Sequence, residues 1–171
     1  VGIAKGNIIA ADVETTNAAS VLDMATFTLT VTSDNLISGN NGSIKTQNSS
    51  ASPITLSSGT WKQEIVFNAT GAQTVPAGTY ADLTITGSGT KTTGGALTVN
   101  GVLSLTKANA SPLLLNLEDA LTGTFTTAAG DGVLVLNTNT TAGDLPSGKT
   151  WNFNVSSEQS GYVLPELTMN N

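Results

Sequence analysis

Acidic side chains are the main residues in this sequence that could supply general acid–base chemistry. The chain has twelve Asp and Glu residues and six lysines, and it contains no His, Cys or Arg. Glycoside hydrolysis needs two carboxyl groups that converge on one bond, but most of these acids stand alone in the sequence. The one adjacent pair, Glu118-Asp119, would point to opposite faces of a strand. We therefore expect no catalytic residues, and a protein that is not an enzyme.

Nucleophilic catalysis is the second chemistry to consider, and it needs a base beside a Ser or Cys nucleophile. With His and Cys missing, lysine is the base that remains for a serine. Ser43-Ile44-Lys45 and Ser147-Gly148-Lys149 are interpreted as loops rather than as catalytic pairs.

Calcium is the metal that this composition still allows, because calcium binds carboxylate and carbonyl oxygens from Asp, Asn and Gly loops. The candidate ligands are Asp131, within Gly130-Asp131-Gly132, and Asp144. A plain turn made of Gly and Asp explains the same residues. We expect no cofactor, with calcium at these two residues as the alternative.

Four aromatic residues form a candidate strip for stacking on sugars. They are Trp61, Tyr80, Trp151 and Tyr162. The competing interpretation places them at corners or in a stack inside the fold, because the first two follow a Gly-Thr pair in the same way.

The composition indicates an all-β, extracellular type of protein. Charged residues make up 11 % of the chain, against roughly 25 % in ordinary globular proteins, and there are 28 threonines and 18 glycines. Threonine favours strands, whereas glycine favours turns. The net charge of −6 argues against nucleic acid as a partner. The sequence contains no run of 18 apolar residues, so we expect no insertion into a membrane. Low charge with abundant Thr, Ser, Asn and Gly suggests a bacterial-type cell surface.

Short alternating runs predict half-buried strands along the whole chain. In each run apolar side chains occupy one face and Thr, Ser or Asn the other. The predicted strands are residues 27–31, 54–56, 65–67, 83–85, 97–99, 102–105, 133–136 and 151–155.

An internal repeat favours a solenoid. Gly59-Thr60-Trp61 precedes one strand-like run, and Gly78-Thr79-Tyr80 precedes the next, nineteen residues later. Residues 73–106 resemble the repeat units of large bacterial cell-surface and secreted adhesin-like proteins. That resemblance implies a parallel β-helix and a surface location. Residues 108–131 depart from the pattern, and Leu113-Leu114-Leu115 before Glu118-Asp119 is less typical of a solenoid coil.

The predicted fold is therefore a parallel β-helix, or β-solenoid, in a single domain of residues 1–171. The alternative is an antiparallel β-sandwich of pilin or adhesin type with strand exchange. Asn100-Gly101 fits both, because this dipeptide closes two-residue hairpins and also suits a solenoid corner.

The functional hypothesis is a structural module of an extracellular filament, stalk or adhesin shaft. The chain would self-associate into a homopolymer by strand pairing or end-to-end stacking, because sheet edges recruit further strands. The residues expected to mediate assembly are Ile8 and Ile9 near one end and Leu167 and Met169 near the other. The alternative function is a carbohydrate-binding surface module whose partners are surface glycans.

Overall fold

All regular elements of the described chain are β-strands. The computed structural model describes residues 1–13, 17–32, 42–57, 60–108, 113–117, 121–122, 126–127, 133–137 and 167–170. Within these ranges every pair of neighbouring strands is parallel. The described part holds no helix long and apolar enough to cross a membrane. The expected all-β fold is confirmed.

The strands form three sheets, named here the long, N-terminal and C-terminal sheets. The long sheet comprises β1 (Gly2–Ile3), β3 (Val21–Asp23), β5 (Ser43–Thr46), β7 (Thr60–Phe67), β9 (Gly78–Gly87), β11 (Leu97–Val99), β12 (Val102–Lys107), β14 (Leu121–Thr122) and β15 (Thr126–Thr127). The N-terminal sheet comprises β2 (Ile8–Ala10), β4 (Leu29–Val31) and β6 (Ile54–Leu56). The C-terminal sheet comprises β8 (Gln73–Val75), β10 (Gly89–Thr93), β13 (Leu113–Leu117), β16 (Val133–Asn137) and β17 (Leu167–Asn170).

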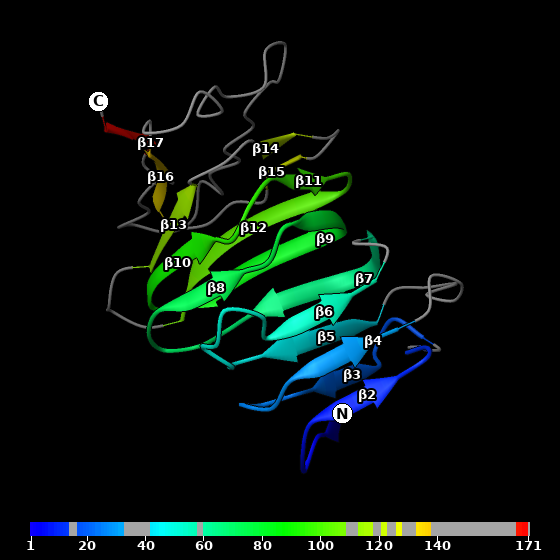
Figure 1. The fold of residues 1–171 in the computed structure, drawn as a ribbon. Helices are drawn as coiled ribbons and strands as arrows, with labels where there is room; N and C mark the ends of the chain where they lie inside the picture. The colour runs from blue at the N-terminus through cyan, green and yellow to red at the C-terminus, as the bar shows by residue number, and fades with distance from the viewer. Residues whose placement is uncertain are drawn as a thin grey trace.

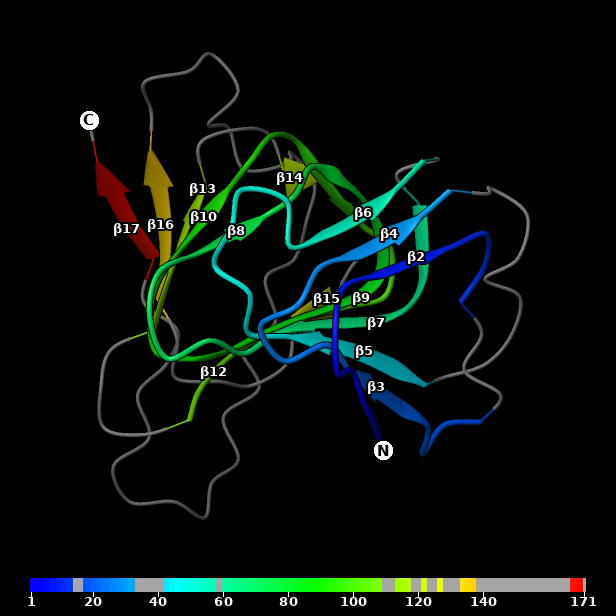
Figure 2. The same cartoon turned by 60° about the horizontal axis from the view of Figure 1, so that its bottom comes forward.

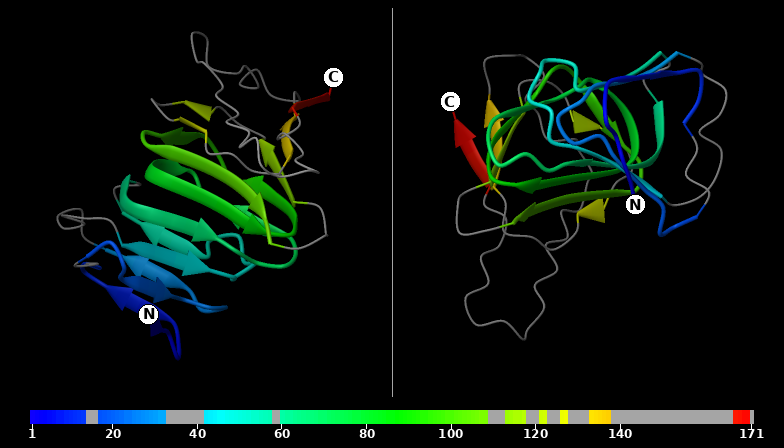
Figure 3. Two further views of the ribbon diagram at one scale, coloured as in Figure 1. Left: turned by 180° about the vertical axis from the view of Figure 1, so that it is seen from behind. Right: turned by 90° about the horizontal axis from the view of Figure 1, so that it is seen from below.

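Successive coils stack on one another, as in a β-solenoid (Figure 1). The coils alternate between the long sheet and one of the two other sheets. Figure 2 shows them obliquely, and the right view of Figure 3 shows them end-on. Parallel strands need a connection of a dozen or more residues, and here the remainder of each coil is that connection. Ile65 thus lies opposite Leu83, and Leu83 opposite Leu103, each about 20 residues further along. The parallel β-solenoid is the observed fold, and the antiparallel sandwich is wrong for the described residues.

The core is a column of aliphatic side chains that the register places above one another. Ile44, Ile65, Leu83 and Leu103 are in register on four successive strands, and at most 2 % of each is exposed. Inward residues of β4, β5, β6, β7, β9, β11 and β12 belong to this core, so the apolar alternation of the sequence becomes one continuous core along the solenoid.

Threonines form a column on the opposite face of the long sheet. Thr60, Thr79 and Thr98 are in register on β7, β9 and β11. The neighbouring register pair Trp61 and Tyr80 shows that the repeated Gly-Thr-aromatic sequences occupy equivalent places in two successive coils. The nineteen-residue repeat is thereby confirmed at this position.

Asn100-Gly101 makes a solenoid corner and not a hairpin. The strands on either side of it, β11 and β12, both pair in parallel with β9. The N–H of Gly101 donates to the Ala81 carbonyl at 2.6 Å, and that of Val102 donates to Oδ1 of Asp82 at 2.7 Å. A Cβ atom on Gly101 would collide with both of these acceptor residues, so the close approach of two backbones requires glycine here.

Two details of the sequence interpretation were wrong. The segment beginning at Leu113 is a regular solenoid strand, because β13 pairs with β10 on one side and with β16 on the other. Its leucines do not alternate with polar residues, which hid the strand from a search for period two. Ser43 and Lys45 lie on strand β5 and not in a loop.

We expect Gly87→Ala to lower the free energy of unfolding by about 2 kcal/mol or more. Gly87 has φ of 89°, and an added Cβ would collide with the Ala69 carbonyl of the preceding coil. Gly71→Ala is the matched control, since its Cβ meets nothing within 4 Å and its φ is not in the left-handed region. This control should change stability by about 1 kcal/mol at most. Urea denaturation of both variants measures the difference, and equal stabilities would contradict the proposed packing of the corner.

Candidate functional site

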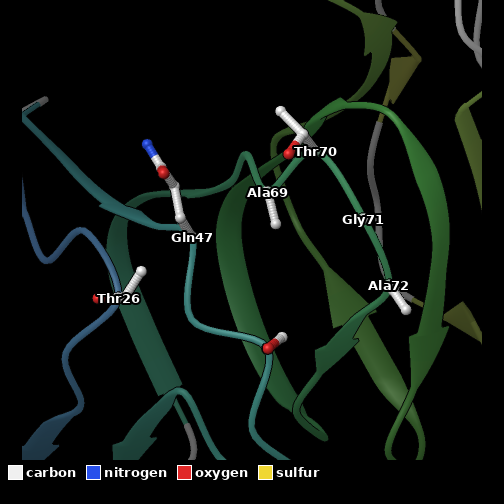
Figure 4. Close-up of a pocket in the computed structure, with 7 residues that line it drawn as sticks. Thr26, Gln47, Ala69, Thr70, Gly71 and Ala72 are labelled. Atoms are coloured by element: carbon white, nitrogen blue, oxygen red, sulfur yellow. The ribbon is translucent and has the colours of Figure 1, made fainter.

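A polar groove at one corner of the solenoid is the candidate site among the described residues. It encloses about 580 Å³. Thr26 and Gln47 lie on one side of it, and residues 69–72 lie on the other (Figure 4). All of its lining side chains are uncharged: Thr26, Gln47, Ser49, Ala69, Thr70 and Ala72, together with Gly71.

Three successive corners build this groove. They are residues 24–28 between β3 and β4, residues 47–53 between β5 and β6, and residues 68–72 between β7 and β8. Hydrogen bonds join the first corner to the second: the N–H of Gln47 donates to the Ala25 carbonyl at 2.7 Å, and Nδ2 of Asn48 donates to the Thr26 carbonyl at 2.7 Å. The groove is therefore a hollow between stacked turns of fixed register.

Gln73 joins the second corner to the third. Its Nε2 donates to the carbonyls of Thr46 and Asn48 at 2.9 and 3.0 Å, and its Oε1 accepts from the N–H of Ala69 at 3.2 Å. The side chain is 3 % exposed. A buried amide with its donors and acceptor satisfied adds stability without a desolvation penalty.

Lys91 joins the third corner to the next coil, as Gln73 joins the second corner to the third. It is in register with Gln73, and its Nζ donates to the carbonyls of Ala69, Gly71 and Ser88 at 2.8, 2.5 and 2.7 Å. The side chain is fully buried, and this burial lowers the pKa of the amine to about 8. Its three carbonyl acceptors match the three donors of an ammonium group.

Ser88 closes the corner above the groove. Its hydroxyl donates to the Thr70 carbonyl at 2.8 Å, and its N–H donates to the Ala69 carbonyl at 3.3 Å. Ser88 and Lys91 have the Ser-x-x-Lys spacing of some nucleophilic enzymes, a signal that the sequence interpretation missed. In the structure Lys91 contacts the carbonyl of Ser88 and not its hydroxyl, so the pair holds the backbone and does not form a nucleophile with its base.

The aromatic residues expected to stack on sugars belong to the core where they are described. Trp61 is 2 % exposed and Tyr80 is fully buried. The Tyr80 hydroxyl donates to the Pro76 carbonyl at 2.6 Å, and burial raises the pKa of this phenol well above its usual range. Neither ring offers a face to solvent, which corrects the sugar-stacking interpretation for both residues. Trp151 and Tyr162 lie outside the described residues.

The remaining candidates are the calcium ligands and the assembly residues. The calcium candidates Asp131 and Asp144 are outside the described residues, and the described part contains no group of three potential His, Cys, Asp or Glu ligands. Ile8 and Ile9 lie on β2, and Leu167 and Met169 lie on β17.

The register places two acids opposite each other, and both form hydrogen bonds to neighbouring strands. Glu64 lies opposite Asp82 on β7 and β9. The Glu64 carboxylate accepts from the Thr84 hydroxyl at 2.7 Å, and the Asp82 carboxylate accepts from the Val102 N–H at 2.7 Å. Each carboxylate therefore joins its own strand to the next coil.

Comparisons with family models, curated proteins and solved structures find no match for this chain. The chemistry of the site therefore rests on its own geometry. The groove offers hydrogen-bonding hydroxyl, amide and backbone groups above a floor that Gln73 and Lys91 hold in place.

We expect the stability of the protein to rise between about pH 8 and pH 10 because of Lys91. The folded-state pKa is about 8, whereas an unfolded lysine titrates near 10.4. In this window the unfolded state binds one proton more, so the free energy of unfolding increases, by at most about 1.4 kcal/mol per pH unit.

The difference in unfolding free energy between the wild type and Lys91→Met, followed by urea denaturation across this pH range, isolates the effect. Tyr80 remains in both proteins, and its raised pKa lowers stability only above about pH 10, where unfolded tyrosine ionises. A difference that stays constant from pH 8 to 10 would show that the buried amine keeps its proton.

Proposed function

We propose that this chain is a structural module of an extracellular filament, stalk or adhesin shaft on a bacterial-type cell surface. It self-associates into a homopolymer, and strand pairing or end-to-end stacking of solenoids joins the copies. The observation that carries this proposal is the residue type at the outward positions of the two edge strands, β1 and β2.

Isoleucine occupies the outward position of both edge strands. On β1, Ile3 is 59 % exposed and is in register with Asp23 of the next strand. On β2, Ile9 is 79 % exposed and is in register with Thr30, which is followed by Thr55. In both sheets the outward residue is therefore polar on the second strand and apolar on the edge strand.

These edges can accept another strand. Among the described residues, β1 pairs only with β3, and β2 pairs only with β4. Unpaired N–H and C=O groups of an edge strand recruit a further chain unless charge, proline or a covering segment prevents it. A strand docked there would hydrogen bond to the backbone and bury Ile3 and Ile9. Ile8, the inward residue of β2, is already partly buried against the core.

The C-terminal sheet provides a second edge at the other end. Strand β17, which carries Leu167 and Met169, pairs in parallel with β16 and is the last strand of its sheet. Repeated contact between different ends of identical subunits generates an open filament. This geometry supports stacking of one copy on the next.

The carbohydrate-binding module remains the alternative function. Burial of Trp61 and Tyr80 removes these two rings from a sugar-stacking strip. The polar groove favours the alternative at a different place, because its hydroxyl and amide side chains suit a ligand rich in hydroxyl groups.

We expect Ile9→Lys to reduce polymerisation strongly, because a charged side chain on an edge strand opposes the docking of another strand. Thr55→Lys is the matched control. It introduces the same charge on the same outward column but on β6, the opposite edge strand of the N-terminal sheet and two coils away from β2, and should polymerise like the wild type. Sedimentation and electron microscopy of the purified proteins measure assembly, and circular dichroism verifies that both variants fold.

Deletion of residues 1–12 or of residues 162–171 provides the complementary experiment. Each deletion should abolish assembly and leave a folded or partly folded monomer. A wild-type protein that forms only monodisperse particles would disprove the assembly function. Unchanged polymers in both deletions and in Ile9→Lys would disprove the role of these edges.

A further inference from the structure

The backbone donors of the groove have a fixed direction. Peptide groups are planar and trans, so the C=O and N–H of one peptide point in opposite directions. The carbonyls of Ala69 and Gly71 point inward to the Lys91 ammonium. The N–H groups of the same two peptides, which belong to Thr70 and Ala72, therefore point outward at residues that line the groove.

These two N–H groups are available to a ligand. Neither has a hydrogen-bond acceptor among the described residues, and Thr70 and Ala72 are both exposed. Outward backbone N–H groups beside a concave surface can bind an anionic group, and here two such donors lie on either side of Gly71. The Thr70 hydroxyl, at the same position, adds a third donor.

The local charge favours an anion, although the chain as a whole is acidic. Lys91 places a buried positive charge directly behind the two peptide groups, and its partners are all carbonyl oxygens. No charged side chain lines the groove. Asp23 is the acid nearest in sequence to Thr26. Its carboxylate accepts a hydrogen bond from the N–H of Ala25 within its own turn, at 2.9 Å.

We propose that this groove binds the oxyanion of an acidic saccharide, a carboxylate or sulfate group, on the N–H groups of Thr70 and Ala72. The neutral side chains of Gln47, Ser49 and Thr26 across the groove would hydrogen bond to the sugar hydroxyls. The site is independent of the assembly edges, since it lies at the corner before β4, β6 and β8 and not on the outer side of β1 or β2.

Gly71 allows a direct test, because a Cβ at this glycine meets nothing within 4 Å and its side chain would extend into open space. Gly71→Glu introduces a negative charge beside the two donors, and Gly71→Gln introduces the same bulk without charge. Gly6→Glu is the matched control for net charge, since a Cβ on Gly6 also meets nothing within 4 Å. Gly6 lies at the equivalent corner three coils before Gly71. At about 4.8 Å per coil the two glycines are roughly 14 Å apart, which exceeds the screening length of about 8 Å in physiological salt.

The measurement is a nitrogen-15 NMR titration of the full chain carrying Ile9→Lys, which should reduce polymerisation so that amide signals can be observed and which lies outside the groove. The ligands are a galacturonic acid trisaccharide, maltotriose as its neutral counterpart, and sodium sulfate. We expect the acidic trisaccharide to shift the amides of Thr70 and Ala72 in a saturable manner, and maltotriose to leave them unchanged. Sulfate should shift the same two amides; tighter binding of the trisaccharide identifies the sugar as part of the ligand, and equal affinity identifies the oxyanion alone.

Gly71→Glu should weaken binding of the acidic trisaccharide by at least about fivefold, from one like charge at close range, and Gly71→Gln by less. Gly6→Glu should bind like the wild type. Unchanged binding in Gly71→Glu, or amide shifts that follow the exposed lysines and spare Thr70 and Ala72, would overturn the proposal. Neither result depends on whether the protein polymerises, so the failure of this site and the failure of the assembly function remain distinguishable.

Discussion

The parallel hydrogen bonding between successive coils is the constraint on which the rest of the structure depends. Each strand must meet its equivalent one coil later, so residues about 20 positions apart become nearest neighbours, as Ile65, Leu83 and Leu103 do. A coil of that size cannot bury its own apolar face, and stacking supplies the missing contact. The same register that builds the aliphatic column inside places threonines over one another outside.

Corners use that ladder only in part, and several of the buried polar side chains, namely Asn48, Gln73, Ser88 and Lys91, lie at or beside one of them. Turn residues leave carbonyl groups that no strand neighbour satisfies, and an unsatisfied buried carbonyl is costly. Asn48, Gln73 and Lys91 each donate to carbonyls of the preceding coil at one corner. Lys91 is stable in this place because three carbonyl oxygens surround its amine. One consequence is that the outer side of this corner presents backbone N–H groups.

The sequence predicted the features that repeat from coil to coil and missed those that occur at single corners. Period-two alternation revealed β4, β6, β7, β9, β11, β12 and β16, and the Gly-Thr-aromatic repeat revealed the register of Thr60 with Thr79. The roles of Gln73 and Lys91 were missed, since each looks in sequence like an ordinary polar residue of a strand. A signal was present for Gln73, which is in phase with the inward Val75 on β8. The strand of Lys91 contains no apolar residue that could reveal its inward face. Trp61 and Tyr80 were assigned to the surface as one of two options, and burial by the neighbouring coils could be decided only once the register was known.

The register also explains why the edge of this solenoid differs from its interior. An outward residue within the sheet is flanked by its equivalents in the coils on both sides and needs only to be compatible with water, which suits Thr30 on β4. An outward residue on an edge strand has an equivalent on one side only. If nothing covered that edge, charge or proline would be the expected protection against aggregation. Isoleucine at both outward positions gains free energy only when a further strand removes it from water. The edge strands are therefore better suited to a covered interface than to solvent, and this is the physical argument that supports the proposed assembly.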